Sequence, residues 1–130
     1  MNLSATARRL LDGPNIAVIA TLMPDGSPQT SAVWVARDGE AVVFATTGTL
    51  KLANIRRDPR VSVTVYDRDD PYLELNIRGT VTSVDPDRGV ALIDELSELY
   101  YGKSPYPYHK LGQAWYAVTV RVDRWRTNRD

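Results

Sequence analysis

The stretch from Thr46 to Lys51 combines residue types that bind anions. The first four residues of this stretch are Thr46, Thr47, Gly48 and Thr49. The threonines supply hydroxyl groups, and the glycine supplies a flexible backbone. The free backbone N–H groups of a helix start, next to such hydroxyls, form a ready site for an anion. Lys51 falls in the first helical turn, where the helix dipole disfavours a cation and a bound anion would offset that cost. Two interpretations stay open: an anion site, or a solvated lysine after a threonine N-cap.

A strand and a short helix must hold this stretch in place. Ala41 to Thr46 is β-rich, and the helix after it should last about two turns because Pro59 cannot continue a helix. Val61 to Tyr66 then alternates as a strand. Arg56 and Arg57 fall in the last helical turn, where the dipole favours cations. We therefore interpret these two arginines as structural.

The other elements follow from hydrophobic periodicity and turn residues. Pro24-Asp25-Gly26 predicts a tight hairpin turn, and Gly79 predicts a bulge where a sheet curls. Asp85 and Pro86 predict a helix start, as N-cap and first helical residue. The expected segments are a helix from Ser4 to Leu11, strands 16–22, 28–36 and 73–84, a helix from Asp85 to about Tyr100 that buries Val90, Ile93, Leu96 and Leu99, a Tyr/Pro-rich loop 102–112, a strand 114–122 that includes Trp115, and a polar tail from Asp123.

Six antiparallel strands with short helices between them predict a mainly β fold, a small closed or split β-barrel formed as one domain by residues 1–130. Such a small barrel has little interior room, so a sizeable ligand should bind outside it, at a dimer interface. Three tryptophans and seven tyrosines suit an aromatic interface, although core packing explains them as well.

Composition narrows the possible functions. Sixteen basic and sixteen acidic residues cancel, which disfavours nucleic acid and membrane surfaces as partners. The chain has no cysteine and His109 is its one histidine, so we expect no thiol nucleophile and no metal site. The sequence shows neither the apolar core of a signal peptide nor an apolar run long enough to span a bilayer. We therefore expect a cytoplasmic protein.

Several motifs, taken in order, resemble a known family. They are the strand segment PQTSAVW (28–34), Thr46-Thr47, the segment KLANIRRDPRV (51–61) and a Leu-x-Ile-x-Gly strand that ends at Gly79. Together they resemble the pyridoxamine 5′-phosphate oxidase-like split β-barrels, and more closely the deazaflavin-dependent branch that uses coenzyme F420. The resemblance spans nearly the whole chain. It implies a homodimer with two symmetric cofactor sites in the clefts between the subunits.

The resemblance also implies a set of cofactor-binding residues. The strand along the tricyclic ring contributes Gln29, Ser31 and Val33. The phosphate end maps to Thr46, Thr47, Thr49 and Lys51, with Asn54 as a supporting polar group. The partner subunit supplies an aromatic wall at Tyr72, for which Trp115 is a weaker candidate.

One position departs from the family pattern. Deazaflavin-binding members often carry a second basic residue two positions before the lysine, where this chain has Thr49. With one cation fewer, an acidic cofactor tail would be held less tightly at this loop. The resemblance thus leaves open whether the cofactor is F420 or flavin mononucleotide (FMN).

The implied activity is hydride transfer from reduced deazaflavin to an unsaturated small-molecule substrate, with the chemistry carried by the cofactor. We assign no catalytic residue, although solvent, Tyr106, Tyr108 or His109 could supply a proton. Two alternatives remain: an FMN-binding oxidase or reductase of the same fold, and a non-catalytic flavin- or deazaflavin-binding protein. The Tyr/Pro-rich loop could act as a lid that shapes substrate choice.

Overall fold

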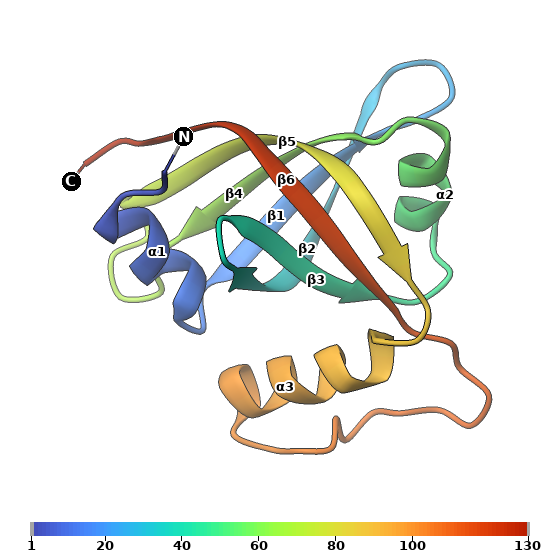
Figure 1. Ribbon diagram of the computed structural model, residues 1–130. Coiled ribbons are helices and arrows are strands. Elements are labelled where there is room, and N and C mark those ends of the chain that lie inside the picture. Colours follow the sequence, from blue (N-terminus) through green and yellow to red (C-terminus); the bar gives the residue numbers. More distant parts are fainter. Residues whose placement is uncertain (1, 130) are drawn as a thin grey trace.

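A computed structural model describes residues 2–129 and shows a closed antiparallel barrel with the strand order β1-β2-β3-β6-β5-β4 (Figure 1). The predicted fold class, mainly β with a six-stranded barrel and short helices, is confirmed. The strands are β1 (Ile16–Leu22), β2 (Pro28–Asp38), β3 (Ala41–Thr46), β4 (Arg60–Tyr66), β5 (Glu74–Asp85) and β6 (Tyr116–Thr127). The helices are α1 (Ala5–Asp12), α2 (Leu50–Arg57) and α3 (Gly89–Tyr101).

Tight turns set the register of the first three strands. Gly26, with φ of 86°, turns the chain between β1 and β2, and Gly39, with φ of 61°, turns it between β2 and β3. Both angles lie in the left-handed region that glycine adopts without steric cost. The hairpin at Gly26 is the one predicted from Pro24-Asp25-Gly26.

Apolar side chains pack together in the interior of the barrel. The fully buried ones include Ile19, Val35, Phe44, Leu75 and Val118. Helix α1 covers one end of the barrel with the completely buried Ala7, Leu10 and Leu11, while α2 lies toward the other end (Figure 1). The Ser4 side chain caps α1, as predicted, by accepting a hydrogen bond from the Ala7 N–H.

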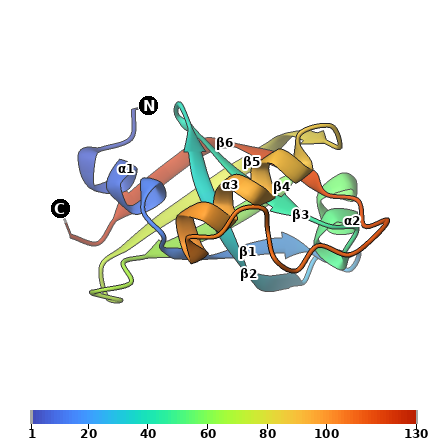
Figure 2. The ribbon, with the colours of Figure 1, turned by 90° about the horizontal axis from the view of Figure 1, so that it is seen from below.

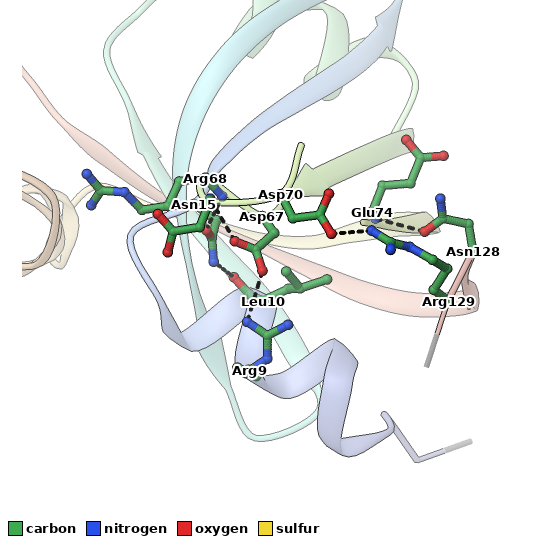
Figure 3. A network of polar contacts seen from close by, with 10 residues as sticks. Arg9, Leu10, Asn15, Asp67, Arg68, Asp70, Glu74, Asn128 and Arg129 are labelled. Atoms are coloured by element: carbon green, nitrogen blue, oxygen red, sulfur yellow. Dashed lines mark hydrogen bonds and ion pairs between the residues drawn. The ribbon is translucent and has the colours of Figure 1, made fainter. Parts of the chain in front are cut away.

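A polar network fastens the β4–β5 loop beside α1 (Figure 3). Arg9 donates to Asp67 at 3.1 Å. The Asn15 side chain donates to the Leu10 carbonyl at 2.9 Å and accepts from the Arg68 N–H at 2.9 Å. Asp67 is 9% exposed, so this acidic loop is an anchored connection at its first residue and not the freely solvated segment that its charge suggests.

The start of α3 was predicted wrongly. Asp85 still belongs to β5, where it pairs with Ala117, and its carboxylate accepts from the Asp87 N–H to turn the chain. The helix begins only at Gly89. The shifted start changes the buried face as well: Ile93 and Leu96 are buried as expected, but Val90 and Leu99 are exposed and Leu92 is buried.

The last strand is also displaced from its predicted bounds. It begins at Tyr116, so Trp115 precedes it, and it continues to Thr127. The expected polar tail is therefore strand, with Trp125 packed against the core. The long partner β5 explains the extension, because its pairing with β6 continues as far as Leu75 opposite Thr127. The predicted bulge is confirmed by a register shift between Arg78 and Gly79.

Asp58 closes α2 and titrates at low pH. Its carboxylate accepts from the Arg60 side chain at 2.7 and 3.0 Å and from the Arg60 N–H at 3.2 Å. These bonds and the nearby positive charge lower the pKa of Asp58 to about 2. A lowered carboxyl pKa adds stability above the ordinary value of 3.8, and this stability is lost as the pH falls toward about 2.

Replacing Asp58 with asparagine should therefore make the melting temperature depend less on pH under acidic conditions. We expect the wild type to lose melting temperature between about pH 4 and about pH 2 more steeply than Asp58→Asn. Thermal melts across this range test it, with Asp69→Asn as an exposed control that removes the same charge. Parallel acid profiles for the wild type and Asp58→Asn would contradict the assignment.

Candidate functional site

A cavity opens where β2 and β3 separate. The two strands pair from Asp38 opposite Ala41 as far as Val35 opposite Phe44, and no further. Beyond this point β2 stays paired with β1 and β3 stays paired with β6. We call the resulting opening the β2–β3 split. Its cavity has a volume of about 300 Å³.

Helix α3 packs against the outer face of β3 and β6 and borders the split (Figure 2). Leu92 and Leu96 contact Val43 and Ala117 in a small second core. Ile93 and Leu96 also reach the cavity. The apolar wall of the cavity consists of Ile16, Ala32, Val33, Trp34, Ala45, Ile93 and Leu96.

Tyr100 holds β2 at the point of separation. Its hydroxyl accepts from the Val35 N–H at 3.1 Å and donates to the Asn15 carbonyl at 2.7 Å. Its ring stacks on Trp34, with centroids 5.0 Å apart and planes 12° apart. Burial raises the pKa of Tyr100. This side chain thus satisfies backbone groups near the split and supports one wall of the cavity.

Replacing Tyr100 with phenylalanine should lower the free energy of unfolding by about 1–3 kcal/mol, because buried backbone groups at Val35 and Asn15 lose their partner. Urea denaturation measures the change. Tyr101→Phe is the matched control, since Tyr101 is half exposed and its hydroxyl has no hydrogen bond within residues 2–129. Equal effects of the two variants would contradict this role.

The polar side of the cavity is the stretch between β3 and α2. Thr46, Thr47, Thr49 and Lys51 all line it. The Thr46 hydroxyl lies 3.3 Å from the Thr49 hydroxyl and donates to the Thr47 carbonyl at 3.1 Å. Thr49 is the N-cap of α2, but its side chain makes no capping hydrogen bond. The helix start therefore lacks its usual side-chain acceptor and faces the same space as three hydroxyl-bearing residues.

Lys51 is a half-buried cation without a counterion. Among residues 2–129 its ammonium group takes part in no ion pair and no hydrogen bond. Burial lowers the pKa of Lys51, because the charged form loses hydration. By contrast, Arg57 donates to the Leu22 carbonyl at 2.6 Å and to Asn54 at 2.8 Å, and Arg56 lies over the Tyr116 ring. The two arginines have structural partners, and the lysine has none.

The other predicted cofactor residues lie outside the cavity wall. Gln29 and Ser31 share the β2 face of Val33, and their Oε1 and Oγ atoms are buried without a hydrogen-bond partner. Asn54 is completely buried and donates to Thr21 at 3.1 Å, so it fastens α2 to β1. Tyr72, in the loop before β5, is 84% exposed and does not line this cavity.

Comparison with known proteins identifies the family. The family model described as pyridoxamine 5′-phosphate oxidase matches residues 3–129. The chain belongs to the pyridoxamine 5′-phosphate oxidase family. No curated protein matches the chain in sequence.

Solved structures agree with this family assignment. One named F420 reductase is 33% identical, with a TM-score of 0.80 over 92% of this chain and 94% of that one. A conserved hypothetical protein from Mycobacterium tuberculosis is 22% identical, with a TM-score of 0.71 over 96% of this chain and 84% of that one. A haem-binding protein from Mycobacterium smegmatis is 21% identical, with a TM-score of 0.66 over 98% of this chain and 55% of that one. The last two show the fold alone.

The family resemblance did not reveal the whole cavity wall. Ile93 and Leu96 had been expected only as buried residues of α3, and Tyr106 only as a possible proton donor. They reach the cavity because α3 and the loop after it fold back over β2 and β3, which no local pattern encodes. Within residues 2–129, no group of three acidic, histidine or cysteine residues is arranged to hold a metal ion, and no helix is long and apolar enough to cross a membrane.

Proposed function

We propose that this chain is an oxidoreductase that binds the deazaflavin coenzyme F420 at the β2–β3 split and transfers a hydride to an unsaturated small molecule. The observation that carries the proposal is Lys51, a half-buried cation without a counterion beside an uncapped helix start. A bound phosphate would supply the missing negative charge. The 33% identity to a protein named F420 reductase supports deazaflavin as the cofactor.

The residues present fit a flavin-type cofactor in two respects. A phosphate suits Lys51 together with Thr46, Thr47 and Thr49. The polar edge of a tricyclic ring suits the unpartnered Gln29 Oε1 and Ser31 Oγ, because buried polar atoms normally have a partner. The apolar wall formed by Val33 and Trp34 would exclude water from the ring.

The cavity volume also favours a dimer. About 300 Å³ is at the lower end of the range for small-molecule sites, so a ring with a phosphate and an acidic tail must extend beyond it. We therefore propose a homodimer in which the second subunit covers the rest of the cofactor. Tyr72 of the partner subunit is our candidate for this cover, because its side chain is exposed and has no packing role in its own barrel.

The mechanism assigns binding and positioning to this chain. When bound, the reduced cofactor supplies the hydride. Lys51 and the helix start would fix the phosphate end, and Val33 would fix the depth of the ring against β2. Trp34, Ile93 and Leu96 would keep the reacting face dry, so that the substrate and not water approaches it.

A fluorescence titration tests the cofactor assignment. The purified protein is titrated separately with F420 and with FMN, and the oligomeric state is measured by light scattering in the same buffer. Micromolar or tighter binding of F420, in preference to FMN, supports the proposal. A preference for FMN would instead indicate an FMN-dependent enzyme. Thr49, at the position where deazaflavin-binding members often carry a second basic residue, favours that alternative. Binding of neither would overturn the cofactor site.

A turnover assay separates an enzyme from a non-catalytic binding protein. Reduced F420 is mixed with the protein and an activated alkene under anaerobic conditions, and the return of the oxidised cofactor is followed by absorbance. We expect the protein to accelerate oxidation of the cofactor in step with reduction of the alkene. Tight binding without acceleration for any of a set of alkenes would indicate a binding protein.

A further inference from the structure

The segment 102–115, between α3 and β6, borders the cavity without forming a helix or strand of its own (Figure 2). It leaves the end of α3 at Gly102 and runs back along the helix to the start of β6. Long segments without secondary structure in compact proteins are commonly active-site loops. Tyr106 and Trp115 from this segment line the cavity together with the apolar residues of the barrel.

One carboxylate of α3 fastens this loop. Asp94 Oδ1 accepts from the Tyr106 N–H at 2.8 Å and lies 2.8 Å from His109 Nε2. Burial raises the pKa of the Asp94 carboxyl, but the Tyr106 N–H and His109 together outweigh burial and lower it. Asp94 is therefore charged at neutral pH and holds two points of the loop with a single oxygen atom.

The Tyr106 ring stands edgewise between two indoles. Its centroid lies 6.0 Å from that of Trp34 and 5.6 Å from that of Trp115, with the planes 87° and 82° apart. The outer side of Tyr106 packs on Tyr108 and His109 at 5.6 and 5.4 Å. Contacts on both sides fix the ring orientation, so its cavity side has a defined shape.

We propose that Tyr106 determines substrate specificity by selecting a flat, uncharged ring, and that Asp94 is the residue that positions it. A flat ring gains edge-to-face or stacked contacts with the three aromatic walls, which a puckered ring cannot make. Among the described residues that line the cavity, Lys51 alone carries a charge, and the proposed function assigns it to the cofactor. The inference rests on the proposed function in one respect, that the substrate meets the bound cofactor at this cavity.

The test compares two ligands with the same carbon skeleton, one flat and aromatic and the other saturated and puckered. Binding of 2-naphthol and of its saturated counterpart decahydro-2-naphthol is measured by calorimetry, with and without saturating F420. We expect wild type to bind 2-naphthol about three- to tenfold more tightly, the range that aromatic contacts supply. Tyr106→Leu should bring this ratio close to one, and Tyr106→Phe should retain it.

Asp94 variants test the positioning role. Asp94→Ala removes both holds on the loop and should reduce the 2-naphthol preference about as much as Tyr106→Leu. Asp94→Asn keeps an oxygen that accepts the Tyr106 N–H, so most of the preference should return. Leu111→Ala is the loop control, because Leu111 is fully exposed and does not line the cavity, so the preference should stay unchanged. Circular dichroism melts confirm that each variant is folded.

Two results would overturn the inference. One is an unchanged ligand ratio in folded Tyr106→Leu. The other is a loss of F420 affinity in Tyr106→Leu equal to the loss for 2-naphthol, which would make Tyr106 part of the cofactor site. If the proposed function is wrong, the wild-type protein will not bind F420. In that case the ratio of the affinities for 2-naphthol and decahydro-2-naphthol, measured without F420, still tests the role of Tyr106.

Discussion

Replacing Lys51 with methionine should weaken F420 binding at least about tenfold and raise the melting temperature. A charge-assisted hydrogen bond to phosphate is worth about 1.5–3 kcal/mol, which corresponds to a tenfold or greater loss of affinity. Methionine retains most of the apolar stem of lysine, so the packing of the half-buried side chain should persist. The fluorescence titration measures the affinity, and calorimetry measures the melting temperature.

The expected gain in stability follows from the direction of the pKa shift. Burial lowers the pKa of Lys51 in the folded state, so the unfolded chain binds this proton more tightly. The cost of burying the charged amine is fully present below the lowered pKa, and it disappears above the ordinary value of 10.5. Lys51→Met should therefore melt at a higher temperature than wild type at pH 7, and the difference should shrink as the pH rises past 10.5.

Lys103→Met is the matched control for Lys51→Met. It removes the same charge from an exposed position in the loop after α3, away from the cavity wall. It should change neither the affinity for F420 nor the melting temperature appreciably. A Lys51→Met protein that lost affinity and stability together would contradict the anion site, because the lysine would then be a structural residue.

Replacing Gly89 with alanine should lower the free energy of unfolding by about 1–3 kcal/mol, which is the usual cost of overpacking, or by more. A Cβ atom at this position would lie 2.1 Å from the carbonyl carbon and oxygen of Trp115 and 2.5 Å from the Tyr116 nitrogen. These are backbone atoms, so α3 and the start of β6 must move apart. The same movement would displace the Trp115 wall of the cavity.

Urea denaturation and 2-naphthol binding measure the two effects of Gly89→Ala. Gly48→Ala is the control for stability, because a Cβ atom at Gly48 would meet no atom within 4 Å and its backbone does not lie in the left-handed region. We expect Gly48→Ala to be nearly neutral. A Gly89→Ala variant as stable as wild type would mean that α3 can shift away from β6 at little cost.

Local patterns were enough to predict the first half of the barrel. The bounds of β1 and β3 agree with the prediction, because short, nearly continuous apolar runs lie between turn residues that permit one backbone path. The helix over 50–57 and its stop before Pro59 are likewise local, since proline acts through its own ring. Because these signals are local, the sequence also marks Thr46, Thr47 and Lys51 as one candidate anion-binding stretch.

The second half of the chain depended on tertiary partners. Asp85 and Pro86 have the chemistry of a helix start, yet β5 continues through Asp85 because β6 offers it a hydrogen-bonded partner. The polar residues after Asp123 become strand for the same reason. A strand gains its backbone bonds from another strand, so the ends of β5 and β6, which no strong turn residue sets, follow the length of the neighbouring strand.

The cavity wall also has one part that local sequence predicts and one part that only the tertiary structure reveals. The charged and hydroxyl-bearing part lies within six consecutive positions, 46–51, and follows from helix chemistry. The aromatic part joins Trp34 on β2, Tyr106 in the loop after α3 and Trp115 before β6. These residues meet only because β2 and β3 separate after Val35 and α3 folds across the opening. Packing over a long sequence separation leaves no periodic signal, so only the tertiary structure reveals this wall.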